Sequence, residues 1–430
     1  MTVKYYFLLK KLSIFVTITN FSLLVTCFTC DTPDSWLSGS RQIEQGSDES
    51  DSDFQHVRIT GEKWPDGVVK YKFNKTLKLV DINDIYNAFD EYHKKTCIRF
   101  EPAEEDDIDF LSIEVDNEVC GKANVCKLGN GSYQFARFGG ICRNMSTMVH
   151  ELGHTLCLGH EHQRRDRDKY ISYADCDDKG NIPKKRRPQF YNANGIYDYA
   201  SQMHYECDSC ELGGWPTSPG FCGVQLTPGL STLDADAINA LYDCQGCKRH
   251  RWRPAEFLTD DEKRNVQSFH ISGSSSIFPC RGSARGEVSP GRFDMEKKSC
   301  FIRFGTELLE IKENVEVLTI PGGLDAQCSI YKLVDRKEAL AEVAVPAGTS
   351  FRSYNFTMYI AYGYDGVTDE NTIGKVGYSS DDKGFTRPAE LAVSVGNSSS
   401  GSTLDYKVLT CSLDSSCVIA QWFVERKGCS

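Results

Sequence analysis

Residues 150–170 read HELGHTLCLGHEHQRRDRDKY and contain four of the chain's nine histidines. On a helix, His150 and His154 lie one turn apart, so both rings project from the same face about 6 Å apart along the axis. Glu151 is rotated about 100° from His150, which lets it hold a water on a metal without being a ligand itself. The spacing predicts a metal site on a helix capped at Asn144, Ser146 or Thr147.

The third histidine of the pattern requires the helix to end. His160 follows His150 by ten residues, and an unbroken helix would carry it about 15 Å away, whereas a zinc–nitrogen bond is about 2.0 to 2.1 Å. Three neutral imidazoles leave a fourth coordination position for water, which indicates a catalytic zinc site. The alternative is a surface helix with scattered histidines, and chance gives this pattern in roughly three of ten thousand such chains.

The composition is that of an ordinary globular protein. Of the 430 residues, 40% are hydrophobic and 25% are charged, and this length suits two or three domains. The net charge is −11, and the sequence pI is near 5.4. An acidic chain argues against nucleic acid as a partner, because phosphate binding requires a basic surface.

Residues 1–30 have the features of a secretory signal peptide. Lysines precede an apolar run, and the small residues Cys27 and Thr29 are suitably placed for cleavage. An uncleaved signal anchor is the alternative, because the run from Leu12 to Thr29 approaches the length of a short membrane span. After cleavage we expect no stable membrane span, since no later stretch is apolar enough.

The cysteines and glycosylation motifs agree with export. The 19 cysteines are spread over the whole length, which favours disulfides in a secreted, extracellular protein. Five N-x-[ST] motifs beyond the signal fit a glycoprotein. They begin at Asn74, Asn130, Asn144, Asn355 and Asn397.

Changes in composition and sequence pattern along the chain divide it into segments. Residues 31–54 are acidic and serine-rich, which predicts a short pro-segment without a fold of its own. Residues 55–247 alternate strand and helix patterns. Residues 248–430 begin with a basic connector and continue as short β-rich runs, which predict a β-rich, sandwich-like accessory domain. No repeat of 20 to 50 residues is visible by eye.

The segment STLDADAINALYDC is expected to form a helix. One face of this helix would be apolar and would carry Leu233, Ala237, Ile238 and Leu241.

The histidine segment resembles the zinc signature of the astacin family of metzincin endopeptidases. The stretch YDYASQMHY, which contains Met203, resembles that family's methionine turn. The resemblance extends over roughly residues 55 to 247. It implies an α+β fold with a twisted mixed sheet, an active-site helix and two subdomains around a cleft.

The same resemblance implies roles for individual residues. His150, His154 and His160 would bind one Zn²⁺ per catalytic domain, and Glu151 would act as general base and acid. Met203 would form an apolar floor beneath the metal, and Tyr205 would steady the transition-state oxyanion. Glu161 would pair with a new amino terminus made on activation, near Gln55. Two disulfides are implied as well: Cys97 with Cys244, and Cys120 with Cys142, although Cys126 can replace Cys120.

The chain departs from the metzincin pattern at Cys157, where the family has a glycine at the bend of the backbone. A side chain at φ > 0 costs about 1 to 2 kcal/mol, which a zinc site outweighs. We expect the site to survive, with Gly159 or a disulfide to Cys157 reshaping the bend. The alternative is that Cys157 binds as a thiolate and leaves a structural zinc. The family's inhibitory aspartate motif is reduced to QGSD, which leaves Asp48 as the candidate.

These features predict a secreted zinc endopeptidase that hydrolyses extracellular proteins or peptides. The strand YQFARF is expected to pair with an extended substrate. Two alternatives from other classes are a pseudoprotease that keeps the zinc-binding fold, and a matrix or adhesion protein. The last of these would bind a matrix or protein partner through residues 248–430.

Overall fold

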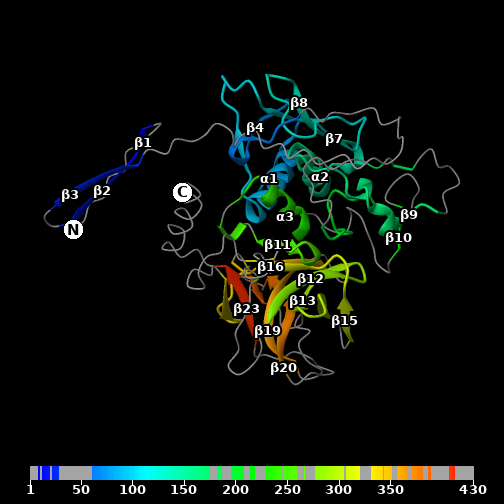
Figure 1. Cartoon of the computed structure of the whole chain (residues 1–430). Coiled ribbons are helices and arrows are strands. Elements are labelled where there is room, and N and C mark those ends of the chain that lie inside the picture. The colour runs from blue at the N-terminus through cyan, green and yellow to red at the C-terminus, as the bar shows by residue number, and fades with distance from the viewer. Residues whose placement is uncertain are drawn as a thin grey trace, which may run out of the picture. The chain divides into compact units, whose positions relative to one another are not determined.

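The structure is a computed structural model of the whole chain (Figure 1). It describes residues 8–9, 12–19, 22–28, 61–174, 182–183, 185, 195–207, 214–217, 229–244, 246–248, 250–258, 266, 277–304, 307–319, 331–341, 343–350, 356–365, 370–380, 386–388 and 406–411. The expected pro-segment 31–54, with Asp48, and the expected amino terminus near Gln55 lie outside these residues.

The chain divides into two compact units, Met1–Val57 with Trp422–Ser430, and Arg58–Gln421. In the first unit, three strands pair in order along an antiparallel sheet: β1 (Leu8–Leu9), β2 (Leu12–Thr19) and β3 (Ser22–Phe28). The signal peptide expected over residues 1–30 stays a prediction. A search of the described residues finds no helix with the length and apolarity that a membrane crossing requires.

The second unit begins with a mixed five-stranded sheet in the order β5-β4-β6-β8-β7. Its strands are β4 (Val68–Phe73), β5 (Arg99–Pro102), β6 (Leu111–Val115), β7 (Gly121–Ala123) and β8 (Gln134–Phe138). The first four in sheet order pair in parallel, and β7 runs antiparallel to β8. The sheet confirms the expected mixed topology and places β7 at one edge.

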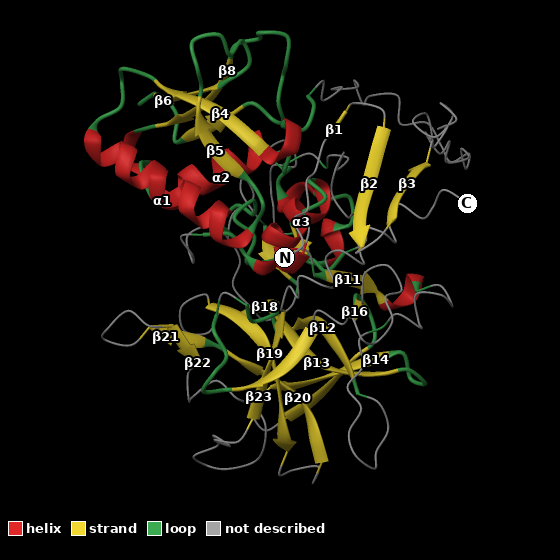
Figure 2. Cartoon of the chain, turned by 90° about the vertical axis from the view of Figure 1, so that its left-hand side faces the viewer, coloured by secondary structure: helices red, strands yellow, loops and turns green. Residues whose placement is uncertain are grey.

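Two helices pack against this sheet, α1 (Leu79–Lys95) and α2 (Met145–Thr155) (Figure 2). α1 has apolar residues at helical spacing, and Ile85, Phe89 and Tyr92 are buried in the core that it shares with the sheet. The phenol of Tyr92 donates to the carbonyl oxygen of Val149 at 2.6 Å. This bond joins α2 to α1, so the packing of α1 against the sheet helps to position the helix that carries His150 and His154.

The third helix, α3 (Thr232–Leu241), begins with a capping box. The Ser231 hydroxyl accepts from the backbone N–H of Asp234 at 2.9 Å, and the Asp234 carboxylate accepts from the N–H of Ser231 at 3.2 Å. The expected apolar face is only partly right. Ile238 is fully buried, but Leu233 and Leu241 are half-buried and the polar Asp234 is buried, because its carboxylate has partners in the interior.

Residues beyond α3 form the expected β-rich region, an eleven-stranded sheet. Its main path runs β11-β16-β12-β13-β18-β19-β23-β17, with β14, β15 and β20 paired beside it. The bounds are β11 (Arg251–Pro254), β12 (Phe278–Ala284), β13 (Glu287–Asp294), β14 (Ser299–Phe304), β15 (Glu307–Ile311), β16 (Glu316–Thr319), β17 (Tyr331–Asp335), β18 (Pro346–Ser350), β19 (Phe356–Asp365), β20 (Glu370–Val376) and β23 (Tyr406–Cys411).

Short elements complete the described chain. The two-residue strands β9 (Ile171–Ser172) and β10 (Trp215–Pro216) pair with each other, as do β21 (Tyr378–Ser380) and β22 (Thr386–Pro388). The 3-10 helices are η1 (Pro65–Gly67), η2 (Gly140–Cys142), η3 (Glu161–Gln163), η4 (Arg167–Lys169), η7 (Gly246–Lys248) and η8 (Ala255–Phe257).

The β-rich region contains a repeated arrangement that we did not predict. β16 lies between β11 and β12, and β23 lies in the same way between β17 and β19. Both central strands carry the tripeptide Val-Leu-Thr, and their leucines, Leu318 and Leu409, are buried in one core. The tripeptides are too far apart for a search limited to 50 residues to find them.

A disulfide between Cys247 and Cys411 connects β23, the last described strand, with the segment that follows α3. A second disulfide, Cys280–Cys300, joins β12 to β14 within the β-rich region. Residues 55–247 contain an odd number of cysteines, so they cannot all pair with one another. The bond from Cys247 to Cys411 agrees with this, because Cys247 pairs outside that segment.

Candidate metal centre

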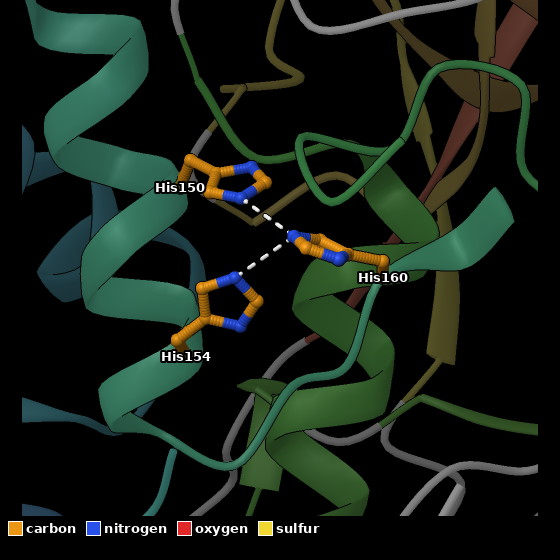
Figure 3. Close-up of side chains that lie close together, drawn as sticks. All are labelled: His150, His154 and His160. Carbon is orange, nitrogen blue, oxygen red and sulfur yellow. Dashed lines mark hydrogen bonds between the residues drawn. The ribbon is translucent and has the colours of Figure 1, made fainter. Parts of the chain in front are cut away.

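The three histidines of the signature converge on one point (Figure 3). α2 is capped by Asn144, whose side-chain oxygen accepts from the N–H of Thr147 at 3.0 Å. His150 and His154 project from this helix, and His160 returns from the segment beyond it. The Nε2 atom of His160 lies 3.2 Å from Nε2 of His150 and 3.0 Å from Nε2 of His154. Nitrogens bound to one tetrahedral zinc lie roughly 3.3 Å apart.

The opposite ring nitrogens fix the imidazoles for metal binding. Nδ1 of His150 lies 2.6 Å from the carbonyl oxygen of Gln202, and Nδ1 of His154 lies 2.8 Å from that of Leu158. A carbonyl only accepts, so both Nδ1 atoms carry the proton and both Nε2 atoms offer a lone pair. Lone pairs aimed at one point repel unless a cation lies between them. The donor set therefore fits a zinc ion, and burial lowers the pKa of His150 to about 4, which keeps it neutral.

The bend that returns His160 is made at Cys157. This residue has φ 77°, the left-handed conformation that the family's glycine adopts readily. Its sulfur is joined to Cys126, whose φ is 63°. The carbonyl oxygen of His154 accepts from the N–H groups of both cysteines at 2.9 Å. The disulfide reshapes the bend as expected, and it contradicts the alternative in which Cys157 binds zinc as a thiolate.

We expect glycine at position 157 to relieve strain once the disulfide is removed. The matched pair C126A/C157G and C126A/C157A both lack the disulfide and differ only in one Cβ at φ > 0. The glycine variant should be more stable by about 1 kcal/mol, because a side chain in this conformation costs about 1 to 2 kcal/mol. Urea denaturation of both variants measures the difference. Equal free energies of unfolding would show that the bend carries no strain.

Glu151 follows His150 on α2 and is buried. It is 4% exposed, and its Oε2 atom has no hydrogen-bond partner among the described residues. A Cβ atom built on Gly121 would lie 2.2 Å from Oε1, so glycine at the start of the edge strand β7 allows the carboxylate to lie close to the strand. Burial raises the pKa of Glu151 to about 8, as expected of a carboxyl group that takes up and releases a proton.

The methionine turn lies against the same site. Met203 is fully buried, and a Cβ on Gly153 of α2 would lie 2.7 Å from its sulfur, so the two elements are in close contact. The ring centroid of Tyr205 lies 4.6 Å from that of His160 and 6.0 Å from that of His150. The ring of Tyr205 also stacks on that of His162, with 4.4 Å between the centroids. The turn thus places the Tyr205 ring close to two of the three histidines.

Glu161 is buried behind the site rather than in it. Its Oε1 atom accepts from Arg164 at 2.8 Å and from the N–H of Asp198 at 2.9 Å. Its Oε2 atom has no partner in the part of the chain that the structure describes. A buried carboxylate oxygen without a donor fits the expected pairing with an amino terminus.

Sequence reasoning missed the residues that hold the methionine turn. The Asp234 carboxylate accepts from the hydroxyl of Ser201 at 2.7 Å and from the N–H of Gln202 at 2.8 Å. Gln202 in turn orients His150 through its carbonyl. Burial raises the pKa of Asp234 to about 6, in spite of these donors. The sequence signal was the S-x-x-D capping box at Ser231, which predicts a helix start but not the contact with the turn.

The implied disulfides are present, and the expected substrate strand is misplaced. The structure pairs Cys97 with Cys244 and Cys120 with Cys142. Strand β8, which contains most of YQFARF, is wrong as the substrate-pairing edge, because β6 and β7 already pair with it on both sides. The free edge next to Glu151 is β7, which is too short and too rich in small residues to stand out in the sequence.

Comparison with known proteins agrees with this geometry. Residues 56–243 match the family model of the astacin peptidases. These residues form an astacin domain. Residues 272–383 of the β-rich region match the model of the DM9 repeat.

Two curated relatives match over the astacin domain. The zinc metalloproteinase nas-6 of Caenorhabditis elegans is 33% identical over 206 residues, which cover 45% of this chain and 57% of the relative. The astacin-like metalloendopeptidase of Gallus gallus is 32% identical over 201 residues, covering 43% and 47%. The chain thus spans about half the length of these relatives. Among solved structures, high choriolytic enzyme 1 of Oryzias latipes, a hatching enzyme zinc-protease, is 27% identical and covers 43% of this chain and 94% of its own, with a TM-score of 0.36.

Proposed function

We propose that the chain is a secreted zinc metalloendopeptidase that hydrolyses peptide bonds in extracellular proteins or peptides. The observation that carries the proposal is the convergence of three imidazole Nε2 atoms beside the buried carboxylate of Glu151. An electron-pair donor set open on one side, next to a proton acceptor, is the requirement for hydrolysis by an activated water. The astacin match over the same residues supports this reading.

His150, His154 and His160 would hold the zinc ion, which would supply Lewis acidity and lower the pKa of a water to about 7. Glu151 takes the proton of the attacking water and delivers it to the leaving amine, because its Oε2 atom is buried and has no hydrogen-bond partner among the described residues. Tyr205 donates its phenol hydrogen to the oxyanion that develops on the scissile carbonyl.

The edge strand β7 is where an extended substrate would bind. Its far side is the end of the mixed sheet, and Gly121 at its start touches Glu151. A peptide that adds to a sheet edge gains main-chain hydrogen bonds whatever its side chains are. A substrate on β7 would therefore run past the general base in an extended conformation.

Metal removal separates this proposal from its alternatives. Wild-type protein should contain about one zinc per chain, and a zinc chelator should abolish cleavage of a fluorogenic peptide, with recovery on adding back zinc. Bound zinc without any chelator-sensitive cleavage, in protein with a processed amino terminus, would favour the pseudoprotease. Partner binding by residues 248–430 without zinc-dependent cleavage would favour the matrix or adhesion protein.

We expect Tyr205→Phe to lower kcat by about 10- to 100-fold with little change in KM. The phenol would act on charge that exists only in the transition state, and removal of one such donor costs up to about 10²- to 10³-fold. The ring packing on His160 and His162 remains in phenylalanine. Steady-state kinetics check this, and Tyr133→Phe is the control, because the Tyr133 phenol donates to Glu114 and not to a residue of the histidine cluster. A change in KM alone would contradict the assigned role.

Processing of the amino terminus belongs to the same proposal. Removal of the signal peptide and of the pro-segment 31–54 would create an amino terminus near Gln55, which the buried Oε2 atom of Glu161 would accept as a charged partner. Sequencing the amino terminus of secreted, active protein tests this step. An active enzyme that still begins at about residue 31 would contradict it.

A further inference from the structure

The β-rich region contacts the first turn of α3. The N–H of Thr232, the first residue of the helix, donates to the Thr349 hydroxyl at 3.2 Å, and the Thr232 hydroxyl donates to the carbonyl of Gly348 at 2.8 Å. The first N–H groups of a helix have no partner within the helix. Thr349, on β18, therefore supplies a cap that the astacin domain itself does not provide.

A buried ion network makes the second contact with α3. Arg281 on β12 is 2% exposed, and its guanidinium donates to Asp236 of α3 at 2.6 Å and to Glu316 of β16 at 2.7 Å. The guanidinium also lies over the ring of Trp252, 4.5 Å from its centroid. Loss of the arginine would leave the buried carboxylate of Glu316 and the half-buried one of Asp236 without their counter-charge. This contact holds the middle of α3 against the sheet.

The same helix holds the metal centre from its other side. Asp234, between Thr232 and Asp236, accepts from the N–H of Gln202, and the Gln202 carbonyl accepts from Nδ1 of His150. Every group along this path is buried. Hydrogen bonds at both sides of α3, joined by the backbone of its first turns, therefore connect the β-rich region with His150.

We infer that Arg281 and Thr349 are positioning residues for the metal centre, which makes the β-rich region part of the working peptidase domain. The inference rests on the proposed function only in that the three histidines bind zinc. The two contacts set the position of α3, α3 sets the methionine turn, and the turn orients His150. Ligands oriented by such surrounding bonds lose metal affinity when the bonds are removed.

The test compares three variants of the full chain. R281M removes the ion network, and T349V removes one hydroxyl without a change of shape. R285M is the matched control, because Arg285 is 41% exposed and its partner Glu307 is exposed as well. We measure the rate of zinc release to a chelator, the absorption spectrum after replacement of zinc by Co²⁺, and kcat and KM on a fluorogenic peptide.

R281M is expected to release zinc about tenfold faster and to change the Co²⁺ spectrum, with kcat lowered more than KM is raised. T349V should show a smaller change in the same direction, about threefold. R285M should match wild type within about twofold. If R281M fails to fold, T349V decides.

Zinc release and Co²⁺ spectra of R281M and T349V identical to wild type, with circular dichroism showing folded protein, would overturn the inference. Zinc release and the Co²⁺ spectrum can both be measured whether or not the protein cleaves peptides. A wild type that binds zinc but cleaves no peptide would refute the proposed function and still allow the comparison of zinc release.

Discussion

The variant Glu151→Gln is expected to lose about 10²- to 10⁴-fold in kcat while it keeps about one zinc per chain, because general-base catalysis contributes that much. Glutamine has the shape of glutamate, so it should keep the close contact that residue 151 makes with Gly121. The amide cannot take the proton of water. Steady-state kinetics and elemental analysis on the same preparation measure both quantities.

The control for this experiment is Glu118→Gln, which removes an exposed carboxylate near the same edge of the sheet. It should leave kcat and zinc content unchanged. Retention of more than about a tenth of wild-type kcat in Glu151→Gln would assign the general base to another residue. Loss of zinc along with activity would instead show that Glu151 has a structural role in the site.

The second large effect is expected for His160→Ala. Its Nε2 atom is the point on which the rings of His150 and His154 converge, so its removal leaves two ligands on α2 and opens the site to water. Zinc content of purified protein should fall from about one per chain to near zero, and peptide cleavage should fall to background. Elemental analysis after gel filtration measures the first, and a fluorogenic peptide the second.

His93→Ala is the matched control for His160→Ala. His93 is on α1, and its ring accepts from the N–H of Phe100, outside the metal centre. Its loss should lower stability without lowering zinc content. Full zinc occupancy in His160→Ala would show that the third ligand comes from elsewhere in the chain, which would remove the geometric basis of the proposed site.

The metal centre was the most predictable part of this molecule. Helical periodicity alone places His150 and His154 on one face, and bond length alone forces the turn before His160. The structure shows both. The disulfide between Cys126 and Cys157 was expected only as one way to make the bend, because pairing depends on which strands lie side by side.

The parts that escaped prediction depend on contacts between distant segments. Asp234 has the sequence signal of a helix start, but its burial follows from the methionine turn packed against it. The edge position of β7 follows from sheet order, which a three-residue strand does not encode. The contacts of Thr349 and Arg281 with α3 join residues more than forty positions apart in the sequence. Local sequence patterns do not predict such pairs.

The bond between Cys247 and Cys411 has a consequence for protein that has been cut after synthesis. A protease that opens the basic connector after Lys248, or any loop between there and β23, would leave both fragments covalently joined. On a denaturing gel such material would run as one band without reductant and as two with it. Purified preparations judged intact by size alone would therefore include nicked molecules, and only reduced samples would reveal them.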